Sequence, residues 1–323
     1  MSIQLKLLVI LFLLSIHCFS QDYKGSIVDA KTQKGIPYAN IGIPNKGYGV
    51  ICNENGEFIL KITTEKDTDV IQVSNIGYQT KYIALAQFKK IGESNCKLEL
   101  TETVYELATT TVRPNEYETK IVGAKDASEL KCDGQLSVKG SANDTATARI
   151  NKEKGIKNEG IGLEMGNKIK IDKGQQTFID KIRFKTCLKP NDTCVYRINI
   201  YTEGETKKRM ITPFGVVKLV STTNVMKEPV VLKVIGKTDV QEIDLSAQNI
   251  EVFDDFMIAI ECLYTSNDDI NLAMDVSVFG STDLFFREST MAEWIKIPLI
   301  DVTFVSASVT QKKQKNFWNK LFN

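Results

Sequence analysis

The chain has 323 residues, a formal net charge of +1 at pH 7 and a hydrophobic content of 42%. This hydrophobic content is enough for packed cores and argues against global disorder, and the length suggests two domains. A near-neutral chain without a basic stripe is a poor candidate for binding nucleic acid or an anionic membrane surface. Composition therefore favours a globular protein whose partners are of another kind.

The first twenty residues predict export. Lys6 precedes an apolar run from Leu7 to Ile16, and the small residue Ser20 closes the segment. This order is typical of a secretory signal peptide at residues 1–20, and the apolar run is too short to span a bilayer comfortably. We expect cleavage after Ser20, with an uncleaved anchor or lipidation at Cys18 as alternatives. The expected location is the periplasm or the cell surface.

Cleavage would also remove His17, the single histidine of the chain, and would leave 40 basic and 40 acidic residues. Zinc sites of the His₂Glu or His₃ type need imidazole, and so do Ser–His–Asp and Cys–His catalysis. The sequence contains no CxxC pair, and no Walker A, GxSxG or Rossmann pattern lies in a suitable strand–helix setting. We therefore expect a protein that is not an enzyme and has no organic cofactor.

Residues 22–112 predict an all-β domain. Short segments with period-2 alternation are separated by Gly, Asn and Pro, which indicates a sandwich, and no helical periodicity competes with it. The Asn55-Gly56 turn predicts a hairpin between the strands on either side of it. The expected strands are residues 24–29, 38–43, 48–53, 57–62, 70–75, 80–85 and 96–100.

Individual residues of this domain have structural explanations. Gly56 and Gly77 are expected at positive φ in turns, and Phe58 on the buried face of its strand. Pro37 enters a strand at its start, where a missing N–H is harmless. Tyr78 is expected to seal an edge of the sandwich rather than to bind a ligand.

The motifs "GSIVDAKTQKGIPYANIGI", "NENGEFILKI" and "VIQVSNIGYQTKYIAL" occur in this order. Together they resemble the carboxypeptidase regulatory-like domain, a family that is common in exported proteins of Gram-negative bacteria. The resemblance covers about ninety residues and implies a prealbumin-like sandwich of seven strands. It implies no catalysis, because the family domain is not catalytic.

The rest of the chain predicts a second β domain. Residues 113–168 look like a linker and a polar insertion, because they are rich in Gly, Asn and Lys. Strand patterns return over residues 169–310 and predict a jelly-roll-like antiparallel β-sandwich. The basic and aromatic tail, residues 311–323, is either a short amphipathic helix near an outer membrane or a partner, or a frayed end.

Candidate ligand-binding residues are few. Trp294, Tyr201 and Tyr264 could form a stacking platform for a sugar, with packing in the core or at an edge as the alternative. Asp268 and Asp269 are candidate calcium ligands, because hard oxygen ligands cluster in such loops, with a solvated turn as the alternative. Calcium is the one candidate cofactor.

Cys187 and Cys194 flank the turn "LKPNDT" and are the two cysteines closest in sequence. A disulfide between them would close a short loop, but Cys194 shares a strand face with Tyr196, Ile198 and Ile200, and Cys187 is in phase with charged residues. The alternative is that the cysteines are buried thiols, which suits the remaining ones better.

These observations predict a non-enzymatic exported envelope protein, a binding or docking module for a glycan or protein partner. One alternative is a glycoside hydrolase that uses paired carboxylates in the second domain, with Asp254-Asp255 or Asp268-Asp269 as candidates. Adjacent residues of a strand point to opposite faces, which suits cooperation badly. The other alternative is a small outer-membrane barrel formed by the second half of the chain.

Overall fold

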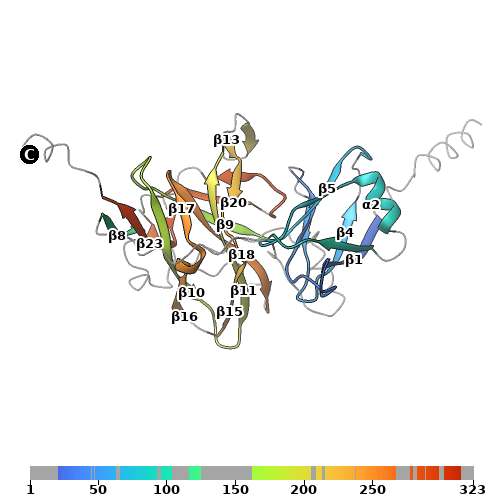
Figure 1. The fold of residues 1–323 in the computed structure, drawn as a ribbon, viewed down its shortest axis with the longest axis horizontal. Coiled ribbons are helices and arrows are strands. Elements are labelled where there is room, and N and C mark those ends of the chain that lie inside the picture. The colour runs from blue at the N-terminus through green and yellow to red at the C-terminus, as the bar shows by residue number, and fades with distance from the viewer. Residues whose placement is uncertain are drawn as a thin grey trace, which may run out of the picture.

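Two β-sandwiches lie side by side along the long axis of the molecule, the N-terminal one at the right of Figure 1. The predicted signal peptide lies outside the part of the chain that the computed structural model describes, and so does the tail beyond residue 313. The described residues are 21–44, 46, 48–62, 66–92, 96–103, 116–124, 162–204, 209–212, 215–236, 238–266, 277–278, 282–287, 289–297 and 302–313.

The N-terminal sandwich has the seven strands that the sequence predicts. One sheet has the order β3-β2-β5-β6 and the other β4-β1-β7. All neighbours are antiparallel except β1 and β7, which are parallel. The strands are β1 (Gln21–Asp29), β2 (Asn40–Ile43), β3 (Tyr48–Ile51), β4 (Glu57–Ile62), β5 (Val70–Ser74), β6 (Lys81–Ala84) and β7 (Cys96–Leu100).

The core of this sandwich follows from the alternation of its strands. In β7, Cys96, Leu98 and Leu100 are buried, and the residues between them are exposed. Phe58 on β4 is 1% exposed and packs in the same cluster, as expected. Burial of a large apolar side chain contributes roughly 1.5–3 kcal/mol, so these positions fix the register of the strands.

Two local features differ from the sequence prediction. A helix, α2 (Leu85–Gly92), follows β6 and buries Leu85 and Phe88, the latter against Tyr23 at 5.3 Å between ring centroids. The predicted hairpin at Asn55-Gly56 is wrong, because β3 pairs with β2 whereas β4 pairs with β1 in the other sheet. The turn carries the chain from one sheet to the other, and turn chemistry alone does not distinguish these connections.

The other predicted turn residues are where their chemistry requires them. Gly56 and Gly77 have φ of +77° and +84°. A side chain at Gly56 would come within 2.5 Å of the Ile27 carbonyl oxygen, so this turn is closed to larger residues. Pro37 is exposed and precedes β2. Tyr78 is half-buried against the core and bridges to Glu102, which agrees with a place at the edge.

The C-terminal sandwich is built from a five-stranded and a nine-stranded sheet. The five-stranded sheet has the order β16-β10-β23-β8, with β17 also paired to β10. The nine-stranded sheet has the order β12-β13-β21-β20-β9-β18-β11-β14, with β15 also paired to β11.

The bounds of the strands of the five-stranded sheet are β8 (Tyr117–Gly123), β10 (Thr177–Cys187), β16 (Thr238–Asp244), β17 (Ile250–Val252) and β23 (Val305–Lys312). Those of the nine-stranded sheet are β9 (Glu164–Ile169), β11 (Thr193–Glu203), β12 (Arg209–Thr212), β13 (Gly215–Val220), β14 (Thr222–Asn224), β15 (Val230–Ile235), β18 (Phe256–Thr265), β20 (Leu284–Arg287) and β21 (Trp294–Lys296). A short pair, β19 (Ser277–Val278) and β22 (Val302–Thr303), and a 3₁₀ turn, η2 (Ser246–Gln248), complete the described elements.

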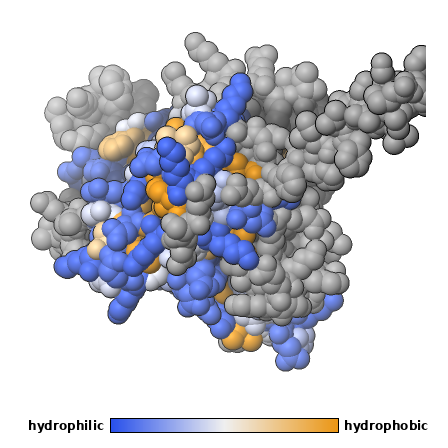
Figure 2. Space-filling view, turned by 90° about the vertical axis from the view of Figure 1, so that its right-hand side faces the viewer, coloured by the Kyte–Doolittle hydropathy of each residue, from blue (hydrophilic) through white to orange (hydrophobic). Residues whose placement is uncertain are grey.

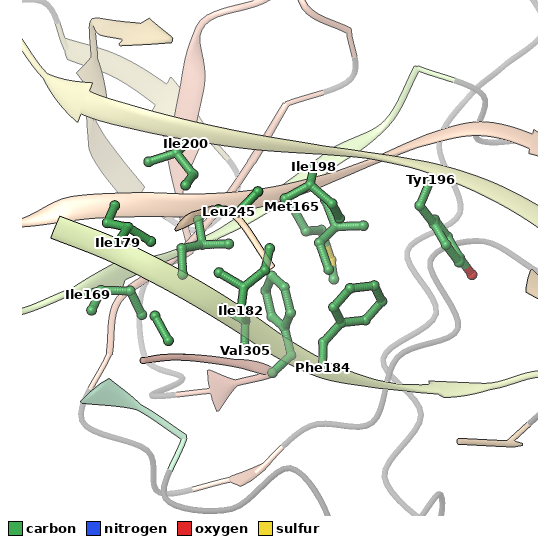
Figure 3. Close-up of a cluster of buried hydrophobic side chains, with 14 of the residues drawn as sticks. Met165, Ile169, Ile179, Ile182, Phe184, Tyr196, Ile198, Ile200, Leu245 and Val305 are labelled. Carbon is green, nitrogen blue, oxygen red and sulfur yellow. The ribbon is translucent and has the colours of Figure 1, made fainter. Parts of the chain in front are cut away.

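The core of the C-terminal sandwich lies between its two sheets. Tyr196, Ile198 and Ile200 point from β11 toward Ile182 and Phe184 of β10 (Figure 3). Phe184 and Tyr196 make an edge-to-face contact with 6.4 Å between ring centroids. The all-β architecture of two sandwiches is therefore confirmed.

The segment predicted as linker and insertion, residues 113–168, contributes two strands. β8 forms the edge of the five-stranded sheet beside β23, and β9 lies between β18 and β20 in the nine-stranded sheet. The polar composition of this segment concealed them: β8 is largely exposed, and β9 contains Glu164, Gly166 and Asn167. The C-terminal sandwich therefore includes residues on both sides of the polar stretch.

The surface at the N-terminal end is mostly hydrophilic, with small separate hydrophobic areas (Figure 2). No helix within the described residues has the length and apolar character needed to span a membrane.

Candidate functional site

The nine-stranded sheet is buried on both faces where it passes between the two domains. Along β11, even-numbered residues face the core of the sandwich, and odd-numbered residues face the opposite side. Arg197, Asn199 and Tyr201 on that opposite face are each no more than 4% exposed. Glu261 on the neighbouring strand β18 lies opposite Arg197 and is fully buried. We call this side of the nine-stranded sheet its outer face.

Part of this sheet closes on itself. Val220 of β13 pairs with Trp294 of β21, whereas Thr222 of β14 pairs with Glu203 of β11, and only Ser221 separates β13 from β14. Residues 215–224 therefore connect the two ends of the sheet. The Trp294 indole N–H donates to Thr222 Oγ1 at 3.0 Å across this junction. The outer face becomes an enclosed interior at this end of the sheet.

An ion pair and two aromatic rings fill the enclosed interior. Arg287 of β20 donates through Nε to Glu164 Oε2 at 2.7 Å and through Nη2 to the Tyr201 hydroxyl at 2.6 Å. Its guanidinium carbon lies 4.5 Å from the ring centre of Trp294 and 5.1 Å from that of Tyr201. The Tyr201 hydroxyl donates to Glu164 Oε1 at 2.9 Å. The guanidinium of Arg287 is therefore held by hydrogen bonds and by two aromatic rings.

A second ion pair continues this network toward the N-terminal domain. Arg197 donates through Nε to Glu261 Oε2 at 2.8 Å, and its Nη2 lies 2.7 Å from the same oxygen. The Asn199 amide donates to Glu164 Oε1 at 2.6 Å and to Glu261 Oε2 at 3.2 Å, so it connects the two carboxylates. Asn224 of β14 donates in turn to Asn199 Oδ1 at 2.9 Å.

The charges of the network balance. Glu164 and Glu261 are direct cross-strand neighbours on β9 and β18, an arrangement of like charges that is unfavourable by itself. Arg197 and Arg287 supply two positive charges to the two carboxylates. Burial raises the pKa of the Glu261 carboxyl; Arg197 opposes this shift, and Glu164 adds to it. We name Glu164, Arg197, Glu261 and Arg287 the buried charge quartet.

The quartet also binds the N-terminal domain. Arg197 Nη1 donates to the Tyr38 carbonyl oxygen at 2.7 Å and approaches Asn75 Oδ1 at 3.4 Å. The Thr290 hydroxyl donates to Asn40 Oδ1 at 2.6 Å and lies 3.4 Å from Glu261 Oε1. One guanidinium thus contacts a carboxylate of its own sandwich and backbone and side-chain oxygens of the other.

Two further observations characterise this junction. Tyr38 has φ of +57°, a conformation that bulky residues rarely adopt, and its carbonyl is the acceptor of Arg197. Strain of this kind persists where surrounding contacts fix it. Beside Arg197, an apolar cluster joins Ile51 of the N-terminal sandwich to Val195 and Leu263 of the C-terminal one. Polar and apolar contacts therefore hold the two sandwiches together.

The junction leaves little empty space. A small hollow lined by residues of both sandwiches has a volume of about 10 Å³, room for about one water molecule. It is far smaller than the 300–1,000 Å³ typical of small-molecule pockets. Its lining residues are Gly49, Val50, Ile51, Gly162, Ser289, Thr290 and Met291.

The structure brings two of the three predicted sugar-stacking residues together, but not on a surface. Tyr201 and Trp294 pack at 5.6 Å between ring centroids and are 4% and 1% exposed. Neither ring can stack on a sugar from solvent in this arrangement, so the prediction for them is corrected to packing in the enclosed interior. Tyr264 is half-buried and packs beside the apolar cluster of the junction.

The other predicted residues are not at this site. Asp268 and Asp269 lie outside the described residues, and among the residues described no group of three or more His, Cys, Asp or Glu could hold a metal ion. Asp254 is exposed, and Asp255 accepts from the Ile171 amide at 3.2 Å. These adjacent carboxylates serve a surface turn.

The predicted disulfide between Cys187 and Cys194 is corrected. Cys194 is a free, fully buried thiol that lies 3.8 Å from Thr265 Oγ1, whereas Cys187 is disulfide-bonded. The partner of Cys187 is none of the other described cysteines, which are all free. The parity mismatch between the two strand ends, noted in the sequence, is the physical reason: Cys194 faces the core cluster with Tyr196.

Sequence reasoning missed all four residues of the quartet. A signal for two of them was present: Arg197 and Glu261 are the charged residues of the mostly apolar and aromatic stretches "VYRINIY" and "IAIECLY". A charged residue in such a run is buried only when it is paired. Glu164 and Arg287 lie in less regular stretches, and no pattern indicated that they meet.

Comparison with known families confirms the resemblance of the N-terminal part. The family model described as CarboxypepD_reg-like domain matches residues 23–112, which is the N-terminal sandwich. This match covers less than half of the chain, so it identifies that domain and not the whole protein. No curated protein matches the chain.

Similarity to solved structures is low. A protein of the infectious bursal disease virus particle is 11% identical, with a TM-score of 0.24, over 94% of this chain and 64% of that one. A protein of the Gt strain of that virus is 12% identical, with a TM-score of 0.20, over 90% and 64%. A carbohydrate-binding module of the β-sandwich superfamily is 10% identical, with a TM-score of 0.12, over 88% and 96%. This chain spans 64% of the length of the two viral proteins, and no conclusion follows from TM-scores this low.

Proposed function

We propose that the protein is a non-catalytic, exported envelope protein that acts as a rigid binding or docking module for a protein or glycan partner. Export rests on the signal-peptide pattern of residues 1–20. The CarboxypepD_reg-like match supports a structural module at the N-terminus. The binding role rests on the buried charge quartet, whose residues join strands and domains and do not face solvent.

One observation carries the proposal: the buried charge quartet connects strands and domains. Glu164 and Glu261 are 0% exposed, and each is paired with an arginine that also bonds elsewhere in the network. A general acid or nucleophile must reach its substrate, and these carboxylates have no route to solvent across the described residues. Their contribution is to fix one sandwich against the other.

The buried carboxylates Glu164 and Glu261 do not support the alternative that the protein is a carboxylate-based glycoside hydrolase. Two neighbouring carboxyl groups are what a glycosidase needs, but they must flank a sugar in a cleft. Here Asn199 donates to both carboxylates. Arg197 donates to Glu261, Arg287 donates to Glu164, and the Thr290 hydroxyl lies beside Glu261. The geometry favours support of a surface that binds elsewhere.

The test compares binding with turnover for the protein lacking residues 1–20. Saturable binding to glycan arrays or to purified envelope proteins is expected, and a Glu261→Gln variant that remains folded should bind with unchanged affinity. Glycoside turnover that disappears in folded Glu261→Gln or Glu164→Gln would overturn the proposal. Absence of saturable binding across both panels would also contradict it.

A further inference from the structure

β15 is an edge strand of the nine-stranded sheet. Its six residues pair only with β11 within the described part of the chain. Val231 and Ile235 are 43% and 56% exposed, and Lys233 between them is exposed as well. An unpaired strand edge offers a row of backbone donors and acceptors to any extended chain.

Other edge strands carry stronger protection. β16 exposes Asp239, Glu242 and Asp244, and Glu242 pairs with Lys181 at 2.9 Å. On β8, Lys120 pairs with Glu118 at 2.8 Å beside the exposed Ile121. Charges of this kind are a common defence against added strands. β15 has a single charge, and no ion pair joins Lys233 to a described residue.

The exposed side chains of β15 continue the outer face that packs on the N-terminal sandwich. Val231 lies opposite Arg197 on β11, and Lys233 lies opposite Val195. Arg197 and Val195 are residues of the domain junction. At the start of β15, the turn at Gly77 approaches Pro229, since a Cβ at Gly77 would lie 3.9 Å from the proline ring. An added strand would therefore extend an interface that already exists.

Lys233, the one charged residue of β15, indicates which side chains a partner strand would carry. If two copies of this chain paired through β15 so that Val231 met Ile235, the two Lys233 side chains would face each other. Like charges directly opposite in a sheet are unfavourable. A different strand with an acidic residue between two apolar ones would complement Val231, Lys233 and Ile235 in one register.

We propose that β15 is a docking edge for an extended segment of a protein partner, which adds as a strand with an acidic residue opposite Lys233 and apolar residues opposite Val231 and Ile235. This inference rests on the proposed function, because it names the partner class of that docking module. Main-chain hydrogen bonds would provide affinity, and the alternating side chains would provide specificity.

The test uses a synthetic peptide with Val, Glu and Val at every second position and Thr between them. Binding of this peptide should protect β15 amides from hydrogen exchange. Lys233→Glu should weaken binding at least tenfold, and a peptide with Lys in place of Glu should restore it. Val231→Lys should also weaken binding at least tenfold, whereas the control Ile121→Lys, on the edge strand β8, should leave it unchanged.

Several results would overturn the inference. They are equal binding of a peptide N-methylated at alternate amides, equal loss in Ile121→Lys, and a dimer of the protein that Val231→Lys dissolves. Absence of peptide binding by a protein that still binds a glycan would overturn the docking edge but not the proposed function. Carboxylate-dependent turnover would instead overturn the proposed function.

Discussion

Arg197 bonds to Glu261 of its own sandwich and to the Tyr38 carbonyl of the other, so its removal is a direct test at the residue scale. Arg197→Met would leave Glu261 buried without its partner and would cut the bond to the Tyr38 carbonyl. Breaking a buried pair in this way costs about 3–5 kcal/mol. Chemical denaturation should therefore show a loss of this size in the free energy of unfolding.

Two controls separate burial from charge. Arg183→Met breaks an exposed pair with Glu242, which should cost at most about 1 kcal/mol. The double variant Arg197→Met with Glu261→Gln removes both charges of the buried pair, so it should be less destabilised than Arg197→Met alone. A loss in Arg197→Met no larger than that in Arg183→Met would contradict a structural role of the quartet.

The pKa of Glu261 predicts a pH dependence with a defined sign. Because burial raises this pKa in the folded state, the folded protein binds the proton more tightly than the unfolded chain does. The stability that this group contributes is present at low pH, and it is lost as pH rises from the ordinary value of 4.5 through the folded pKa. Compared with Glu261→Gln, the wild-type protein should lose stability as pH rises through this window.

Glu242 provides the opposite control. Hydrogen bonds from Lys181 and Arg183 lower its pKa, so its contribution is present above 4.5 and is lost as pH falls through the folded pKa. Denaturation of the three proteins should be measured on both sides of pH 4.5. Relative to Glu261→Gln, the wild-type protein should lose stability as pH rises above 4.5, and relative to Glu242→Gln it should lose stability as pH falls below 4.5. The same sign for both would contradict the assignment for Glu261.

At the scale of elements, the sequence predicted strands well and the burial of their second face poorly. The alternation in β11 correctly placed Tyr196, Ile198 and Ile200 on one face. It could not show that the opposite face, which carries Tyr201, is covered as well. Coverage comes from residues 215–224 and from the N-terminal sandwich, which are distant in sequence. α2 was missed because its eight residues are too few for a clear helical period.

The closure of the sheet predicts the environment of Trp294. The chain has two tryptophans, so Trp318→Phe leaves Trp294 as the sole emitter. Because Trp294 is 1% exposed, its emission should be blue-shifted and resistant to quenching by iodide. The same variant in denaturant provides the fully accessible reference. Quenching in the native state equal to that reference would show that the interior is open.

The spacing of Cys187 and Cys194 suggested a disulfide across the turn between β10 and β11, but the structure gives Cys187 a different partner. Cys194 is free, whereas Cys187 is bonded. If the expected cleavage removes Cys18, Cys132 is the one cysteine of the chain left as an intramolecular partner for Cys187. Peptide mapping without reduction, after unfolding in the presence of an alkylating reagent, should find a Cys132–Cys187 bridge and an alkylated Cys194. A Cys187–Cys194 peptide would contradict the structure of this turn.

At the scale of the whole molecule, the sequence predicted two sandwiches but not their union. The N-terminal motifs identified the family of the first domain, and the strand patterns predicted the second as all-β. The polar stretch after residue 113 suggested a linker, yet β8 and β9 belong to the second sandwich. The junction depends on Tyr38, Asn40 and Ile51 meeting Arg197 and Thr290, and contacts between such distant residues leave no local pattern.

If the buried charges serve to join the two sandwiches, the domains should unfold together. Scanning calorimetry of the protein lacking residues 1–20 should show one transition, with equal calorimetric and van't Hoff enthalpies. In a variant with Arg197→Met and Thr290→Val, this transition should separate into two. Two independent transitions in the wild-type protein, one of them unchanged by these substitutions, would contradict the central claim that the quartet joins the domains.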